Sequence, residues 1–355
     1  MKFAAYAKEY IPKINDAINK IYEKKLNNIK NSFLKHYYSE LKDYFLSGGK
    51  RIRPLLCIAT YNAFSENQDD RIILPSTGVE FLHNASLIHD DIIDKDDFRR
   101  GKSAFHFRFR NYHKKYNSLR MNDIDFGNSI GIIGGDSAFF LGLEAYLFNN
   151  FEKVLNLNAI KLYEQGFIDI ADGVLIEIDM VNKKNLSISD YIEMVSLKTG
   201  ALLEKSILIG ANYAKVGGTI MKDLSIYGIN LGIVFQIIDD ILGTFGDEKL
   251  TGKPTDGDIR EGKKTCLLIG AINKLAEKER EKLIKLTEKP DMTNSDVQSV
   301  KDLFIKADVV ETSKILADSY FQEAKLSLNK LRSKINPSEM EFYEDLLGFV
   351  KARKF

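Results

Sequence analysis

Apolar residues along most of the chain recur three and four positions apart, the spacing that places them on one face of an α-helix. Between Arg71 and Ile93, for example, Val79, Leu82 and Ile93 fall on one stripe. The same spacing predicts further helices at Ser129–Phe151, Asn158–Val181, Ile188–Ala214, Met221–Phe245, Thr265–Leu286 and Val309–Leu331. No segment alternates between apolar and polar residues as a half-buried strand does. The pattern predicts an all-α protein of long antiparallel helices around one core.

Charged or polar segments at 95–103, 111–128 and 247–262 interrupt the helical pattern and are expected to be loops. A further polar break at 289–295 precedes a C-terminal helical part, which we interpret as an extension of the same domain. The chain has no internal repeat at the period of a solenoid. We therefore predict a single all-helical domain over residues 1–355.

The composition excludes some functions. The chain has 355 residues, 44% of them hydrophobic, with 51 Lys and Arg against 50 Asp and Glu. This balance argues against nucleic acid as the main partner, so charged function must come from local clusters. Cys57 and Cys266 lack metal-ligand spacing and suit the reduced thiols of a cytoplasmic protein. No run of about 18 uncharged apolar residues occurs, so we expect no membrane span.

The most prominent polar motif is the run Asp90-Asp91-Ile92-Ile93-Asp94. On a helix, Asp90 and Asp94 lie one turn apart on the same face, where two like charges are unfavourable unless something compensates them. Mg²⁺ would do so, because it binds one or two carboxylates and completes its shell with water and phosphate oxygens. Arg99 and Arg100 follow and suit diphosphate oxygens. Taken alone, the motif would equally fit a solvated acidic helix end before a basic loop.

A second acidic motif lies inside an otherwise apolar helix. Gln236 shares a helix face with Asp239 and Asp240, three and four residues later. Carboxylates in an apolar stretch are costly unless they are paired or bind a metal. The following loop supplies Lys253 and Lys263, whose ammonium groups suit phosphate. A solvated helix C-terminus is the alternative, but a second acidic motif followed by lysines favours a metal and phosphate site.

Three weaker features fit the same chemistry. The segment Gly48–Pro54 has two glycines and then three cations before an apolar helix, which suits an anion site near a helix N-terminus. Lys198 stands beside Gly200, where a ligand can approach the backbone. His83 precedes Asp90 by seven residues, about 10 Å along a helix axis, which would place a second phosphate ligand near the metal site. In isolation, these residues would be read as solvated cations and a core histidine.

Together the motifs resemble the trans-isoprenyl diphosphate synthases, the family that includes farnesyl and geranylgeranyl diphosphate synthases. The matching stretches are GGKRIRP (48–54), LHNASLIHDDIIDKDDFRRGKSAFH (82–106), GGDSAFF (134–140), SLKTGALLE (196–204), FQIIDDILGTFGDEKLTGKP (235–254) and GDIREGKKT (257–265). The last two are similar to archaeal geranylgeranyl diphosphate synthases in particular. The resemblance implies the isoprenoid synthase fold, with helices around a central active-site cavity, and a homodimer.

The resemblance also implies roles by position. Asp90 and Asp94 would hold two Mg²⁺ ions, and Asp239 would hold a third. The residues expected to bind the allylic diphosphate are Arg99, Lys198, Gln236, Lys253 and Lys263. Those expected to bind isopentenyl diphosphate are Lys50, Arg53, His83 and Arg100. In catalysis, Thr199 and Gln236 would place oxygen dipoles beside the allylic cation, and Lys198 would follow the departing pyrophosphate.

Two positions depart from the family pattern. Gly243 stands where the second motif commonly has a third Asp. This puts a ligand at that fifth position in doubt, but not the role of Asp239. Val174 stands where the family usually has Gln, so no role is carried over to it.

The residues just before the first motif bear on product length. In the family, aromatic residues four or five positions before the motif stop the product at fifteen carbons, whereas here Ala85 and Ser86 are small. We therefore expect geranylgeranyl diphosphate and disfavour farnesyl diphosphate, with a longer product left open. Leu82, Phe139 and Phe140 are candidates for the tunnel floor, although both phenylalanines would also suit an ordinary core.

Two other functions compete with prenyl diphosphate synthesis. A class I terpene cyclase shares the fold and the first motif, but it binds one diphosphate, so a second set of cations argues against it. A non-catalytic subunit of a heteromeric synthase would not need the intact DDIID, RR, KT and QIIDD motifs seen here.

Overall fold

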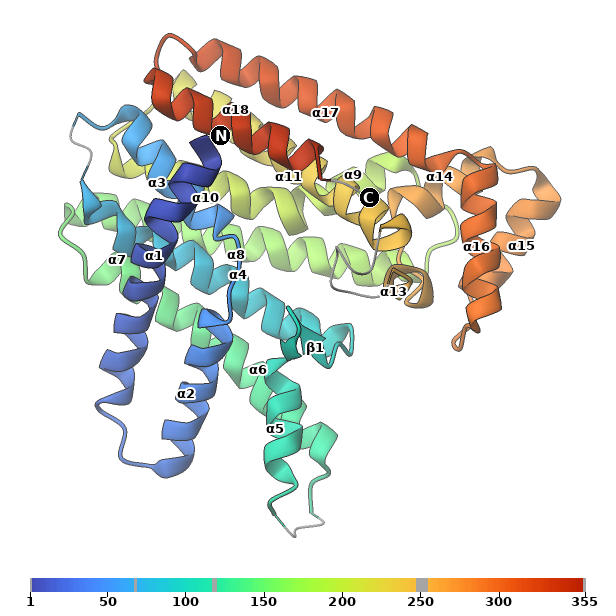
Figure 1. The fold of residues 1–355 in the computed structure, drawn as a ribbon, viewed down its shortest axis with the longest axis horizontal. Helices are drawn as coiled ribbons and strands as arrows, with labels where there is room; N and C mark the ends of the chain where they lie inside the picture. The colour runs from blue at the N-terminus through green and yellow to red at the C-terminus, as the bar shows by residue number, and fades with distance from the viewer. Residues whose placement is uncertain (1, 67–68, 117–119, 247–254, 354–355) are drawn as a thin grey trace. The chain divides into compact units, whose positions relative to one another are not determined.

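The computed structural model describes residues 2–66, 69–116, 120–246 and 255–353, most of them in helices (Figure 1). The all-α prediction is confirmed. In the described residues the strands are β1 (Phe98–Arg99) and β2 (Lys102–Ser103), which pair as an antiparallel hairpin inside the segment expected to be a loop. The chain divides into two compact units, one of residues 1–164 and 205–217, the other of residues 165–204 and 218–355.

The first unit is built around α4 (Ile73–Ile93), which packs against α1, α3 and α6. Aromatic rings of Tyr22, Phe45 and Phe81 meet beside it, with ring centroids 4.8 to 5.5 Å apart. Gly78 allows close packing, because a Cβ at this position would lie 2.3 Å from the Tyr146 hydroxyl. The other elements are α1 (Lys2–Leu26), α2 (Ser32–Leu46), α3 (Ile52–Phe64), η1 (Asp70–Ile72), α5 (Phe105–His113), α6 (Asp123–Gly142) and α7 (Glu144–Leu147). Two helices, α8 (Lys153–Val181) and α10 (Ala201–Tyr213), belong partly to each unit.

The second unit is built around α11 (Thr219–Phe245), with α17 (Val309–Leu331) and α18 (Pro337–Lys351) beside it (Figure 1). The Tyr227 hydroxyl of α11 donates to the backbone oxygen of Tyr343 in α18 at 3.0 Å, inside the core. The remaining elements are α9 (Ile188–Val195), the π-helical turn η2 (Ser196–Gly200), α13 (Gly257–Arg260), α14 (Cys266–Lys274), α15 (Glu277–Thr287) and α16 (Asn294–Lys306).

The helix bounds differ from the predicted ones where local geometry interrupts a continuous apolar pattern. The helix expected at Ile188–Ala214 contains the π-helical turn, and the one expected at Ser129–Phe151 begins at Asp123 and ends at Gly142. The side chain of Asn122 accepts a hydrogen bond from the Asp125 N–H and fixes that earlier start. Prediction of a single domain over the whole chain stays a prediction.

Two stretches, Asp123–Leu147 and Thr219–Phe245, are long and apolar enough to cross a membrane by length and composition alone. The core helix of a helical bundle passes the same test, and 61% of the most apolar window of Thr219–Phe245 is buried within the chain.

Candidate active site

In the first unit, the loop before α3 gathers cations around a glycine turn. Gly48 and Gly49 have φ values of +95° and +128°, a conformation that side chains disfavour. The guanidinium of Arg100 donates to the Gly48 backbone oxygen at 2.8 Å. Arg51 is buried and binds Glu80 at 2.7 Å. Arg51 therefore anchors the loop, and Arg53 is left for a ligand.

Arg53 has a property that points to an anion. Its Nε atom is buried and lacks a hydrogen-bond partner among the described residues. Burial lowers the pKa of Arg53 to about 10, with Glu80 opposing the shift and Arg100 adding to it. His83 lies in the same electrostatic environment, since burial and then Arg53 and Arg100 hold its pKa well below the usual value. A cationic pocket with an unpartnered buried donor suits a diphosphate.

The first acidic motif ends α4 and its members have different environments. Asp90 and Asp94 are partly exposed, whereas Asp91 is fully buried. The Asp91 carboxylate accepts hydrogen bonds from the Arg99 Nε and, at 3.1 Å, from the Tyr44 hydroxyl. Burial raises the pKa of Asp91 to about 6, against the effect of Arg99. Asp91 therefore fixes Arg99, while Asp90 and Asp94 are partly exposed.

The residues expected to control product length lie on the buried side of α4. Ala85 and Leu82 are fully buried, and the Ser86 hydroxyl bonds the His83 backbone oxygen at 2.8 Å. Phe140 is 74% exposed in this chain. It therefore belongs neither to the core nor to an interior floor of this unit.

A further candidate for the tunnel floor lies where Gly142 of α6 packs closely against α4 and α8. A Cβ at Gly142 would lie 2.7 Å from the Tyr163 hydroxyl and 2.8 Å from the Phe81 Cβ. The Tyr163 hydroxyl donates to the Phe139 backbone oxygen at 2.6 Å. Phe81 and Tyr163 therefore close the space between these helices at this level.

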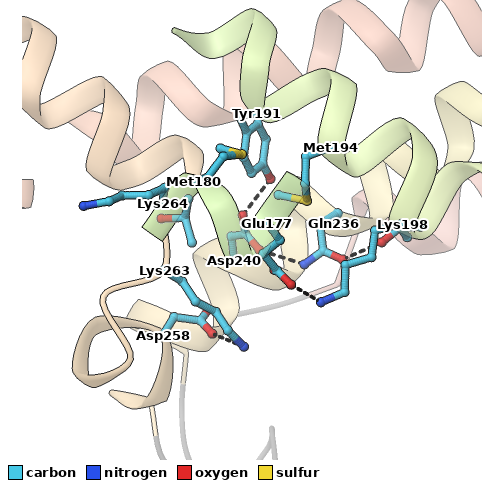
Figure 2. A pocket seen from close by; sticks show the side chains of 12 residues that line it. Glu177, Met180, Tyr191, Met194, Lys198, Gln236, Asp240, Asp258, Lys263 and Lys264 are labelled. Atoms are coloured by element: carbon cyan, nitrogen blue, oxygen red, sulfur yellow. Dashed lines mark hydrogen bonds and ion pairs between the residues drawn. The ribbon is translucent and has the colours of Figure 1, made fainter. Parts of the chain in front are cut away.

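In the second unit, a cavity of about 90 Å³ brings together several of the predicted residues (Figure 2). It combines lysines, carboxylates and two methionine side chains. Its lining residues are Glu177, Met180, Tyr191, Met194, Lys198, Thr199, Gln236, Asp240, Asp258, Lys263, Lys264 and Thr265.

The π-helical turn at Ser196–Gly200 positions Lys198 and Thr199 at this cavity. π-helical turns are rare and occur frequently at functional sites. Glycines let neighbouring helices approach the turn: a Cβ at Gly173 would lie 2.4 Å from the Lys198 nitrogen, and one at Gly232 would lie 2.4 Å from the Gly200 Cα. The Lys198 ammonium forms an ion pair with Glu177, which a diphosphate would have to replace.

Gln236 joins two sides of the cavity through its amide (Figure 2). Its oxygen accepts from the Thr199 hydroxyl at 2.9 Å, and its nitrogen donates to Asp240 Oδ1 at 2.8 Å. Asp240 also accepts from the Tyr191 hydroxyl at 2.6 Å. Burial raises the pKa of Asp240 to about 8, with Asp258 adding to the shift and both hydrogen bonds opposing it.

Asp239, next to this buried residue, is partly exposed and forms an ion pair with Arg353. The Arg353 guanidinium also lies 4.7 Å from the centre of the Phe235 ring. A cation thus stands at the carboxylate expected to bind metal, which fits a site with affinity for positive charge.

Lys263, between α13 and α14, is a further predicted residue of the second unit. Lys263 forms ion pairs with Glu261 at 2.8 Å and with Asp258 at 3.8 Å. A Cβ at Gly243 would lie 3.1 Å from an oxygen of Asp258. The space that a third motif aspartate would occupy is therefore next to another carboxylate. Lys253 lies outside the described residues.

Several cavity residues had not been predicted from the sequence. Tyr191, Glu177 and Asp258 contact predicted residues but had been given no role; Tyr191 and Glu177 lie outside the matching stretches, and Asp258 lies within GDIREGKKT. Among the described residues, no group of three or more His, Cys, Asp or Glu side chains is arranged to hold a metal unaided.

Comparison with known proteins places these features in one family. Residues 35–304 match the family described as polyprenyl synthetase. Geranylgeranyl diphosphate synthase of Sulfolobus acidocaldarius is 31% identical, over 94% of this chain and 93% of the relative. Geranylfarnesyl diphosphate synthase of Aeropyrum pernix is 30% identical, over 86% and 91%.

A solved structure has the same fold. It is a geranylgeranyl pyrophosphate synthase from Corynebacterium glutamicum, complexed with isoprenyl diphosphate and magnesium. It aligns with a TM-score of 0.91 at 24% identity, over 98% of this chain and 99% of that one.

Proposed function

The chain belongs to the polyprenyl synthetase family, and we propose that it joins isopentenyl diphosphate to allylic diphosphates to form geranylgeranyl diphosphate, with release of pyrophosphate. The observation that carries this proposal is the similarity to geranylgeranyl diphosphate synthases over nearly the whole chain. The chemistry of the residues supports it, because acidic motifs and phosphate-binding cations occur in both units. Terpene cyclisation and a non-catalytic subunit are not favoured, since the similar proteins are synthases.

Three Mg²⁺ ions would be held by Asp90 and Asp94 in one motif and by Asp239 in the other. The donors fit, because all three are partly exposed carboxylates and the position beside Asp239 already attracts a guanidinium. When bound, Mg²⁺ withdraws negative charge from the allylic diphosphate and makes pyrophosphate a better leaving group.

The cations divide into two diphosphate sites. The unpartnered Nε of Arg53 and the neutral ring of His83 suit isopentenyl diphosphate, together with Lys50 and Arg100. The allylic diphosphate would be bound by Arg99, Lys198, Gln236, Lys253 and Lys263. In the second unit, Lys198 and Lys263 line the cavity and would exchange their carboxylate partners for phosphate oxygens.

In the reaction, the C–O bond of the allylic diphosphate breaks and its electron pair leaves with pyrophosphate. The double bond of isopentenyl diphosphate then attacks the allylic carbon, and a proton is lost from the adjacent carbon to the released pyrophosphate. Thr199 and Gln236 supply oxygen dipoles that stabilise the positive charge. The buried apolar wall around Leu82 and Ala85 would keep water away from the cation.

Small residues at positions 85 and 86 support a product longer than fifteen carbons. The similarity to the Sulfolobus enzyme favours the twenty-carbon product, and the similarity to the geranylfarnesyl synthase makes a longer one the alternative. The floor would be Leu82, with Phe81 and Tyr163 below it.

We also propose a cytoplasmic homodimer. Both cysteines are buried free thiols, as suits a reducing compartment. The α6 helix exposes 50% of Ile132, 55% of Ile133 and 74% of Phe140, an apolar surface that a second copy would cover. Sedimentation of the purified chain tests the dimer.

The enzymatic proposal is tested by incubating the purified chain with Mg²⁺, isopentenyl diphosphate and dimethylallyl, geranyl or farnesyl diphosphate in turn. Chromatography of dephosphorylated products should show geranylgeraniol from each primer. A cyclic hydrocarbon would indicate a cyclase, and no product would indicate a subunit that needs a partner.

A further inference from the structure

A hydrogen-bonded series runs from the cavity into the core of the second unit (Figure 2). It begins at Thr199 on the π-helical turn, passes through Gln236 and Asp240 on α11, and ends at Tyr191 on α9. Asp240 and Tyr191 are 4% and 1% exposed, so water does not substitute for their contacts.

The series has a direction, because its members are not symmetric donors and acceptors. In the ionised carboxylate, both oxygens of Asp240 accept hydrogen bonds, one from Tyr191 and one from Gln236. The Gln236 amide must therefore turn its NH₂ group to Asp240 and its oxygen to Thr199. A hydroxyl has one proton, so the Thr199 hydroxyl donates it to Gln236 and keeps its lone pairs for other contacts.

This direction matters for the chemistry of the site. Lone pairs on the Thr199 oxygen stabilise positive charge that develops in the cavity, whereas an O–H turned into the cavity would oppose it. If Gln236 were free to rotate, both orientations of Thr199 would be populated. The buried end of the series, formed by Asp240 and Tyr191, therefore selects one orientation of the Thr199 hydroxyl.

We propose that Tyr191 is a positioning residue for the prenyl transfer: through Asp240 and Gln236, it holds the Thr199 hydroxyl with its proton turned away from the reacting carbon. This inference rests on the function proposed above. Tyr191 itself touches neither substrate nor metal in this role, and it acts by keeping the Asp240 carboxylate in the orientation that Gln236 requires.

A second tyrosine offers a matched control. Tyr227 is also fully buried and lies on α11, but its hydroxyl donates to the Tyr343 backbone oxygen at 3.0 Å and does not line the cavity. Tyr191→Phe and Tyr227→Phe each remove one buried hydroxyl and keep the ring. A general loss of packing or stability would affect both variants alike.

The first measurement is steady-state kinetics of the two variants with Mg²⁺, isopentenyl diphosphate and farnesyl diphosphate. Tyr191→Phe should lower kcat about tenfold or more, the usual effect of removing a partner that orients a ligand or catalytic group. KM for isopentenyl diphosphate should stay within about threefold of the wild type, because none of its proposed contacts is lost. Tyr227→Phe should keep the wild-type kcat. An unchanged kcat in Tyr191→Phe would overturn the proposal.

The second measurement asks whether Tyr191 acts through Thr199. Thr199→Val removes the hydroxyl at nearly constant shape, so adding Tyr191→Phe to it should lower kcat no further. Multiplied losses in the double variant would show that Tyr191 acts by another route and would overturn the inference. If Tyr191→Phe fails to fold, Asp240→Asn replaces it in the same double-mutant cycle. The asparagine NH₂ group donates a hydrogen bond where the carboxylate accepted one, so it reverses the direction of the hydrogen bonds.

Failure of this inference is distinguishable from failure of the proposed function. If the wild-type chain makes no prenyl diphosphate, the proposed function itself is wrong. A wild-type chain that is active, with Tyr191→Phe equally active, removes only the role of Tyr191.

Discussion

The two acidic motifs share one arrangement of aspartates but differ in the residues that surround it. In each motif, a partly exposed aspartate, Asp90 or Asp239, precedes a buried aspartate that accepts a hydrogen bond from a tyrosine hydroxyl. The second donor differs. Asp91 accepts a hydrogen bond from the charged Arg99 Nε, whereas Asp240 accepts one from the neutral amide of Gln236.

The second donor determines which side chain each buried aspartate holds in place. Burial raises the pKa of both carboxyl groups: to about 6 for Asp91, where Arg99 opposes the shift, and to about 8 for Asp240, where the Asp258 carboxylate adds to it. The first motif thus fixes Arg99, the proposed diphosphate ligand, and the second fixes Gln236, whose oxygen dipole is proposed to lie near the reacting carbon. In both, the partly exposed aspartate is the proposed metal ligand.

We expect the largest effect from removing the partly exposed carboxylates. Asp90→Ala or Asp239→Ala should each lower kcat by about a thousandfold or more, because a lost metal ligand removes several kcal/mol of charge stabilisation. Thermal unfolding should be almost unchanged, since both side chains are partly exposed. Exposed Asp291, changed to Ala, is the control and should keep full activity. Near-normal activity of Asp90→Ala in magnesium buffer would contradict the assignment.

The buried carboxylates should act mainly on stability, and to different degrees. Asp91→Ala strands Arg99 without its buried partner and should cost about 3–5 kcal/mol of unfolding free energy. Asp240→Ala strands only neutral donors and should cost about 1–3 kcal/mol. Urea unfolding of the two variants measures the difference. Equal losses would mean that the charge of Arg99 is not what distinguishes the two motifs.

The diphosphate sites can be separated kinetically. Arg53→Ala should raise KM for isopentenyl diphosphate about ten- to a hundredfold, the range expected for a lost charged hydrogen bond. Lys263→Ala should instead raise KM chiefly for the allylic substrate. Initial rates with each substrate varied in turn test this. Equal effects of both variants on both substrates would mean that two sites have not been distinguished.

The smallest expected effect concerns pH. The pKa of His83 lies well below its ordinary value of 6.5 because burial, and then the neighbouring arginines, disfavour the charged ring. Below about pH 6.5 the unfolded chain takes up a proton that the folded chain does not, so stability falls as pH falls. His83→Gln should lose less stability than the wild type between pH 7.5 and 5.5. Urea unfolding at each pH measures the unfolding free energy. An equal loss of unfolding free energy in the two proteins between pH 7.5 and 5.5 would contradict this.

The helices and the motif residues were predictable because both depend on local spacing. Apolar periodicity indicated α4 and α11, and each motif aspartate was identified from neighbours within one turn. The π-helical turn was not predictable, since the pattern from Ile188 to Ala214 is continuous.

The supporting residues were missed for a different reason. Tyr191 and Asp240 are 49 residues apart, and Glu177 and Lys198 are 21 apart. Only tertiary packing brings such pairs together. The pairing of Arg353 with Asp239 likewise depends on the course of α18 along α11.

The central claim is that this chain makes geranylgeranyl diphosphate in a tunnel that Ala85 and Ser86 leave open. The most direct test is product chromatography of the wild type, Ala85→Phe and Ser86→Phe, each with Mg²⁺, isopentenyl diphosphate and dimethylallyl diphosphate. We predict a twenty-carbon product for the wild type and a shorter one for at least one variant, because a new ring blocks the tunnel. A wild type that stops at fifteen carbons, or an unchanged product in both folded variants, would contradict the account.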